Sequence, residues 1–164
     1  MTAITAHTAH AQHDEMVEHV DRMPALGDLL LTATADELGP RLEVMDGFLT
    51  GTLLPHMDAS EPVVFPELER LMQNRHSMTP LRREHAEIRR LAAQYSRLRP
   101  QVRDAKHSLG KVLAIRRTIF ALYSLLKVHL AEENFYIDII ERGAEAKAEE
   151  VVTGITEQSV AADA

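Results

Sequence analysis

Two residues that favour metal binding lie in the middle of a long apolar stripe. His129 and Glu133 are four residues apart, so on a helix their side chains stand one turn apart on the same face. The apolar residues that share this face at the 3.6-residue period are Val112, Ile115, Ile119, Leu122, Leu126, Tyr136, Ile137 and Ile140. Burying an imidazole and a carboxylate without partners would cost roughly 2–7 kcal/mol per polar group, and more for a charge. A bound metal ion is the natural compensation.

Three further histidines occupy equivalent positions in other helical segments. His19, His56 and His85 each lie within an apolar stripe, one in each of the three segments that precede His129. Taken singly, a histidine in such a stripe is more often a hydrogen-bonded core residue than a ligand, but four that converge from four helices favour a metal site. Neutral imidazoles bind iron, zinc and copper well. The remaining histidines lie off these stripes or in connections, and we expect them to be exposed: His7, His10, His13, His76 and His107.

The helix that carries His56 needs an irregularity to bring a carboxylate beside it. Ser60, at the i+4 position, is a poor ligand, and Glu61 lies about 140° around an ideal helix from His56. If one residue is skipped near Ser60, the inward positions become Glu61, Val64, Phe65, Leu68 and Met72. Pro62 has no N–H to donate to the carbonyl of Asp58, which loosens this turn. We therefore predict a π-bulge or kink at residues 58–62 that brings Glu61 in beside His56; a regular helix would instead turn Ser60 inward.

The helices that must position these side chains follow from apolar periodicity and from capping signals. Pro24 predicts a kink in the first helix, the segment Thr34-Ala35-Asp36-Glu37 is a capping box for the second, and Thr79-Pro80 begins the third, which Pro100 ends. The predicted helices cover roughly residues 5–33, 34–72, 79–100 and 109–142. We predict an all-α fold, an antiparallel up-down-up-down four-helix bundle over residues 1–143, followed by a C-terminal tail or short docked helix at 144–164.

The composition limits the classes of function. The 164 residues include no cysteine, which excludes disulfides and thiolate metal sites. No run approaches the roughly 18 apolar residues that a membrane span needs, and the N-terminus has no secretory pattern, so we expect a cytoplasmic protein. The net charge is −7, and no aromatic residues alternate with the basic stretch at 82–106, which argues against nucleic-acid binding. No feature of the sequence specifies an oligomeric state.

The ordered set of histidines and glutamates resembles the hemerythrin-like (HHE cation-binding) family over roughly residues 10–142. The segments that carry the resemblance are EHVDRM, PHMDASEPVVFPEL, REHAEI and HLAEEN, which contain a lone His, a His and a Glu before a Phe-Pro break, a lone His, and His-x-x-x-Glu. The resemblance implies a bundle that holds two non-haem irons, bridged by an oxo or hydroxo oxygen and by two carboxylates. It implies His19, His56, His85 and His129 as terminal ligands, with Glu61 and Glu133 as bridges.

This chain departs from the family pattern in two places. The spacing from His56 to Glu61 is one residue longer than the usual His-x-x-x-Glu, and Arg89 stands where many members have a second histidine. Six ligands leave an open or water-filled position, or a seventh donor. The candidates for that donor are Tyr136, Asp58 and Glu132, in falling order.

The resemblance implies a protein that binds or senses O2, hydrogen peroxide or nitric oxide. With fewer ligands, the same centre would act as an enzyme with catalase- or peroxidase-like activity on hydrogen peroxide, and some relatives store or deliver iron. A single zinc ion held by three or four of the histidines would fit the same residue types. A metal-free helical module would instead need hydrogen-bond partners for four buried imidazoles and two carboxylates.

Overall fold

Every regular element in the residues that the structure describes is a helix. The computed structural model describes residues 6–73, 77–103 and 108–162, with the side chains of residues 12–73, 77–102 and 108–143. The elements are α1 (Ala6–Asp21), α2 (Met23–Leu29), α3 (Ala35–Phe48), the π-helical segment η1 (Leu49–Leu53), α4 (Leu54–Ser60), α5 (Val64–Leu71), α6 (Thr79–Arg103) and α7 (Leu109–Ala162). These ranges contain no strand, so the predicted all-α class is confirmed.

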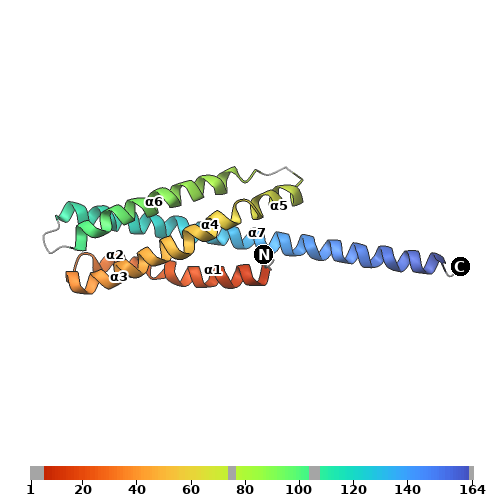
Figure 1. Cartoon of the computed structure of the whole chain (residues 1–164), viewed down its shortest axis with the longest axis horizontal. Coiled ribbons are helices and arrows are strands. Elements are labelled where there is room, and N and C mark those ends of the chain that lie inside the picture. The colour runs from red at the N-terminus through yellow and green to blue at the C-terminus, as the bar shows by residue number, and fades with distance from the viewer. Residues whose placement is uncertain (1–5, 74–76, 104–107, 163–164) are drawn as a thin grey trace.

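The helices lie lengthwise against one another. α1 and α2 follow one another nearly in line, as do α3, η1, α4 and α5, and both lines run beside α6 and the first part of α7 (Figure 1). Residue contacts join α7 to α1, α2, α5 and α6, and they also join α3 to α2 and α6. The interior between these elements is therefore lined from several helices at once, as a metal site in a helical bundle requires.

The breaks near the N-terminus agree with the sequence. The first helical stretch is interrupted at Arg22, and Pro24 lies in the first turn of α2, where its missing N–H costs little. The capping box at Thr34 is present: its side chain accepts from the backbone N–H of Glu37, and the Glu37 carboxylate accepts from the backbone N–H of Thr34. These signals fix where the chain turns from α2 into α3.

The helix that carries His56 has two irregularities: an unpredicted π-helical turn before His56, and a break after it that overlaps the predicted residues 58–62. The π-helical turn lies at residues 49–53, and α4 ends at Ser60 with a turn at residues 61–63 before α5 begins. A π turn adds a residue to the helix, so the inward face moves on by one position: Leu53 is buried and Thr52 is exposed. The break at Pro62 still brings Phe65 and Leu68 into the interior, as the skipped residue predicted.

The last two long helices follow their predicted inner faces but extend further. Every predicted inward residue of α6 is buried: Leu81, His85, Ile88, Ala92 and Tyr95. Pro100 does not end α6, which continues to Arg103. Because Pro100 is exposed and in the final turn, water can hydrate the carbonyl that loses its helical donor. α7 continues as one helix to Ala162, and its C-terminal part extends beyond the other helices (Figure 1); the domain boundary at residue 143 stays a prediction.

Apolar side chains form two clusters inside the molecule. The larger one runs along α1–α4, α6 and α7 and includes Met16, Leu53, Met57, Ile88 and Leu126. The smaller one consists of Phe65, Leu68, Met78 and Leu81, with Val64, Met72, Tyr136 and Ile140 packed against it. On α6, His85 lies between Leu81 of the small cluster and Ile88 of the large one, which places the polar centre between the two.

Candidate metal centre

Two groups of metal-binding side chains share one carboxylate. Among the side chains that the structure describes, His13, His56 and Glu133 form one group, and His85, His129 and Glu133 form the other. The four imidazoles come from α1, α4, α6 and α7, and Glu133 comes from α7. Each of these side chains is buried except that of His56, which is 16% exposed. The arrangement is therefore one polar centre assembled from elements distant in sequence.

The two oxygens of Glu133 face different histidine pairs. Oε2 lies 3.2 Å from Nε2 of His13 and 3.3 Å from Nε2 of His56. Oε1 lies 3.5 Å from Nε2 of both His85 and His129. Within the pairs, the Nε2 atoms are 3.2 Å apart for His13 and His56, and 3.0 Å apart for His85 and His129. In this arrangement one carboxylate offers an oxygen to each pair of imidazoles.

The distances between donor atoms match those around a transition metal. Metal–nitrogen bonds are about 2.0–2.1 Å long, so two donors at an octahedral angle of 90° lie about 2.9 Å apart, and two at the tetrahedral angle lie about 3.4 Å apart. The separations of 3.0–3.5 Å within each group fall in or very near this interval. Each group thus surrounds a space of the size that one metal ion needs.

The outer nitrogens of three imidazoles are already occupied by acceptors. The N–H groups at Nδ1 donate to side-chain oxygens as follows: His13 to Asn134 Oδ1 at 2.7 Å, His85 to Glu61 Oε1 at 2.7 Å, and His129 to Glu84 Oε2 at 2.9 Å. Such outer partners fix the tautomer and leave the Nε2 lone pair directed at the centre. Two bare Nε2 acceptors 3.0 Å apart, as in His85 and His129, repel unless a proton or a metal ion lies between them. The geometry therefore fits a metal better than it fits an apolar core.

The charges in the centre support the same assignment. Burial alone would raise the pKa of Glu133, but its contacts with His129, His13, His56 and His85 outweigh burial and hold that pKa far below its usual range. Burial alone would lower the pKa of His129, yet Glu133 and Glu84 raise it. Glu133 is therefore an anion, and it attracts positive charge into the core.

The helix α1 supplies His13 to this centre, not His19. We expected His13 to be exposed, but it is 1% exposed, and its ring is 5.0 Å from that of His56. His19 is half-buried and outside both groups, and its ring stacks on Phe48 with centroids 4.7 Å apart. Six residues on a helix span about 9 Å, so the two histidines lie at different levels of the molecule. His13 continues the buried stripe of Met16 and Val20 by one more turn, a signal present in the sequence.

Glu61 lies beside His85, not beside His56 as predicted. Its Oε1 accepts from His85 Nδ1 and also from Arg89 Nη1 at 2.8 Å, while Arg89 Nη2 donates to Asp58 at 2.6 Å. Burial raises the pKa of Glu61, but Arg89 and His85 overcome this and lower it, so the carboxylate stays charged. The structure thus places Glu61 on the outer nitrogen of a histidine. Ser60 is buried and donates to the Met57 carbonyl.

The candidates for a seventh donor lie around the centre without joining either group. Asp58 is exposed and paired with Arg89. Tyr136 packs against the small apolar cluster. Burial and the nearby charge of Glu84 raise the pKa of Glu132, and its carboxylate belongs to neither histidine–glutamate group. Four predicted residues therefore meet at the centre, namely His56, His85, His129 and Glu133. The side chains of His7, His10, His76 and His107 are outside the described residues.

Comparison with known proteins identifies the family. A model of the hemerythrin HHE cation-binding domain matches residues 5–137, so the chain belongs to this family, and the resemblance seen in the motifs is confirmed. Searches of curated proteins and of solved structures gave no match. The two histidine–glutamate groups give this cation-binding family membership a structural basis. Within the described ranges, no helix combines the length and apolar character that crossing a membrane requires.

Proposed function

We propose that this protein holds two non-haem iron ions, one in each histidine–glutamate group, inside an antiparallel four-helix bundle. The observation that carries the proposal is the position of Glu133, whose two oxygens each face a different pair of imidazole Nε2 atoms. His13 and His56 would hold one iron, and His85 and His129 would hold the other. Glu133 would bridge them, in place of the two carboxylates that the family resemblance implied.

The proposed activity is binding or sensing of O2 or a related small oxidant such as hydrogen peroxide or nitric oxide. Each group offers three protein donors, whereas iron accommodates up to six, so positions remain for an exogenous ligand. Iron in such a site supplies the electrons that O2 binding requires. The apolar side chains of Phe65 and Leu68 cover one side, with the Phe65 ring 5.3 Å from that of His85, and they limit access of water.

Peroxide disproportionation is the second candidate, and the position of Glu61 favours it. Arg89 and His85 together hold the Glu61 carboxylate at the outer nitrogen of His85. A second bridging carboxylate is then missing, and each metal has more than one position open to solvent-derived ligands or substrate. A centre with several adjacent open positions can bind peroxide and exchange products, which suits turnover more than reversible carriage.

The test is an optical titration of the full chain loaded with iron. The protein is reduced under anaerobic conditions and divided into two samples. One sample then receives a stoichiometric amount of O2, and the other receives hydrogen peroxide. Near-ultraviolet bands that appear with O2 and bleach on its removal support binding or sensing. Sustained O2 evolution from peroxide supports the enzyme instead. A His129→Ala variant that gives the same spectra as the unaltered chain would contradict both, because the site would then lie elsewhere.

A further inference from the structure

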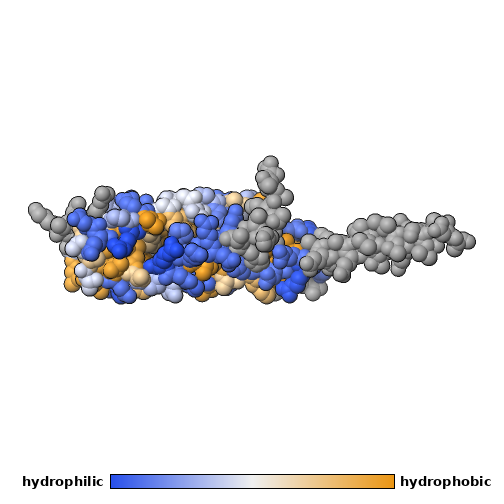
Figure 2. Space-filling view, turned by 90° about the horizontal axis from the view of Figure 1, so that it is seen from below, coloured by the Kyte–Doolittle hydropathy of each residue, from blue (hydrophilic) through white to orange (hydrophobic). Residues whose placement is uncertain are grey.

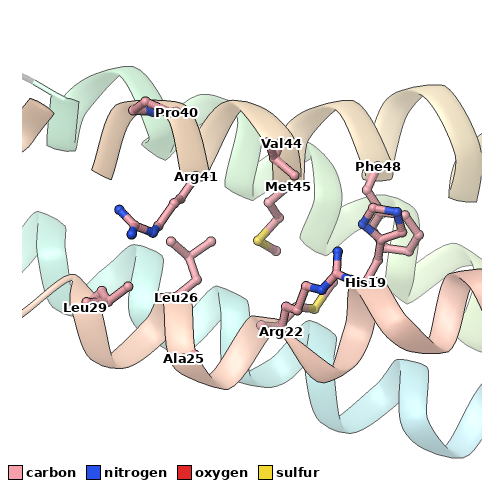
Figure 3. Close-up of a pocket in the computed structure, with 11 residues that line it drawn as sticks. His19, Arg22, Ala25, Leu26, Leu29, Pro40, Arg41, Val44, Met45 and Phe48 are labelled. Atoms are coloured by element: carbon pink, nitrogen blue, oxygen red, sulfur yellow. The ribbon is translucent and has the colours of Figure 1, made fainter. Parts of the chain in front are cut away.

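A cavity separate from the two histidine–glutamate groups lies between α1–α2 and α3. Its volume is about 360 Å³. Its lining is apolar except for three residues, and it consists of His19, Arg22, Met23, Ala25, Leu26, Leu29, Pro40, Arg41, Val44, Met45 and Phe48. In Figure 3, Leu26 and Arg22 extend from one side of the space between the helices and Met45 and Arg41 from the other, and the guanidinium groups of Arg22 and Arg41 lie at opposite ends of it. The volume is at the lower end of the range for small-molecule sites, roughly 300–1,000 Å³.

The polar residues of this cavity all favour a negative charge. Arg22 and Arg41 carry guanidinium groups, His19 adds an imidazole, and the lining contains no carboxylate. Arg22 contacts Glu18 at 3.4 Å, a pair in which both side chains are about 70% exposed and which therefore holds the guanidinium weakly. Arg41 donates from Nη1 to the backbone carbonyl of Glu37 at 2.6 Å. Because a guanidinium has five N–H donors, both side chains keep donors for a ligand.

The remainder of the lining suits an aliphatic chain. Leu26, Met45 and Phe48 are almost fully buried, while Val44 is 61% exposed at the rim. Thioether and branched side chains adapt well to flexible apolar ligands. Figure 2 looks onto this side of the molecule and shows apolar surface gathered towards the end where α2 and α3 meet, next to polar surface. A ligand that fits both features has an apolar body and a single anionic head.

We propose that this cavity binds a small aliphatic carboxylate, a fatty acid of about eight carbons. The carboxylate would contact Arg22, whose exposed pair with Glu18 leaves donors for a charge-assisted hydrogen bond, and the chain would lie against Leu26, Met45 and Phe48. In this proposal His19 is part of the wall of the binding site, where it stacks on Phe48 at one end of the cavity. It does not depend on the identity or the presence of the metals, because no lining residue belongs to either histidine–glutamate group.

Calorimetric titration of the full, metal-loaded chain with octanoate tests the proposal. The matched ligands are octan-1-ol, which has the same chain without the charge, and acetate, which has the charge without the chain. We expect octanoate to bind once per chain and to bind at least about tenfold more tightly than either. An Arg22→Gln/Arg41→Gln variant should bind octanoate at least about tenfold more weakly than the unaltered chain. A Val44→Glu variant should also weaken octanoate binding, since it adds negative charge at the exposed rim.

The matched control is Arg83→Gln/Arg97→Gln, which removes two exposed charges from α6 and should leave octanoate binding unchanged. The proposal is overturned if octanoate shows no binding at about 1 mM, or if octanol binds equally well. Equal binding of acetate and octanoate would also overturn it, because the carboxylate would then be binding the metals. Loss of binding in the α6 control to the same extent as in the cavity variant would show that net charge alone is responsible.

Discussion

The exchange of His19 for His13 in the proposed ligand set gives the sharpest mutational test. We expect His13→Ala to lose one metal ion per chain and His19→Ala to lose none. His13 Nε2 lies 3.2 Å from both Glu133 Oε2 and His56 Nε2, so its removal leaves one metal with only two of its three described donors. Removing an outer hydrogen-bond partner of a ligand already weakens metal affinity about 10–100-fold. Removal of the ligand itself should therefore weaken it at least about 100-fold.

The His19→Ala variant should change stability rather than metal content. The ring is half-buried and stacks on Phe48 at an interplanar angle of 10°. A stacked pair contributes about 0.5–1.5 kcal/mol beyond its buried area, and 1 kcal/mol shifts the melting temperature of a chain of this size by about 2–4 °C. The melting temperature of this variant should fall by a few degrees, with helicity unchanged.

The assay is metal content per chain after desalting in the presence of a weak chelator, with circular dichroism as the check on folding. The unaltered chain and His19→Ala should retain the same amount of metal, and His13→Ala should retain about half. The reasoning is refuted if His19→Ala loses metal while His13→Ala, folded to the same extent, retains all of it.

Three further substitutions test the outer contacts and the fold. Glu61→Ala removes the acceptor of His85 Nδ1 and should lower the affinity for one metal ion about 10–100-fold in a chelator competition. Full affinity in this variant would show that the contact is dispensable. Gly27→Ala places a Cβ 2.6 Å from Phe120 Cε2 and should lower the free energy of unfolding by about 1–3 kcal/mol in urea, and an unchanged midpoint would mean that the ring moves freely. Thr34→Ala removes the N-cap of α3 and should lower the free energy of unfolding by about 1 kcal/mol, measured by thermal unfolding.

The all-helical class and the inner faces of the last two helices could be read from the sequence because they depend on local periodicity. On α6 every predicted inward position from Leu81 to Tyr95 is buried, and on α7 the stripe from Val112 through Glu133 is buried too. Regular helices preserve the 3.6-residue period over these lengths, so the face of His85 and His129 follows directly from counting. The position of a side chain along the helix axis does not follow in the same way.

His13 shows why axial position was missed. Both His13 and His19 lie near the apolar face of α1, and the choice between them depends on which level of the helix faces His56, Glu133 and their neighbours. That level is set by packing between helices, which periodicity within one helix does not encode. His13 lies three residues before Met16 on the buried stripe, but the segment before it is polar, so the apolar period alone does not extend the stripe to His13.

In the irregular helix that carries His56, the sequence predicted the break near Pro62 but neither the π-helical turn before His56 nor the partner of Glu61. Pro62 marks the break that follows Ser60, but the π-helical turn lies at Leu49–Leu53, where Pro55 follows closely and leaves the carbonyl of Gly51 without its α-helical donor. The shift of one residue there moves Leu53 inward in place of Thr52. Glu61 contacts His85 and Arg89, which lie 24 and 28 positions further along the chain, and no local pattern predicts such contacts.

The central claim is that two metal ions share Glu133, and X-ray absorption combined with metal analysis tests it most directly. The full chain, expressed with supplementary iron, should contain two iron ions per chain with nitrogen and oxygen neighbours at about 2.0–2.2 Å. It should also show a second iron at about 3–4 Å from the first, as in other two-metal sites. One metal ion per chain, or two with no metal neighbour within that distance, would contradict the account.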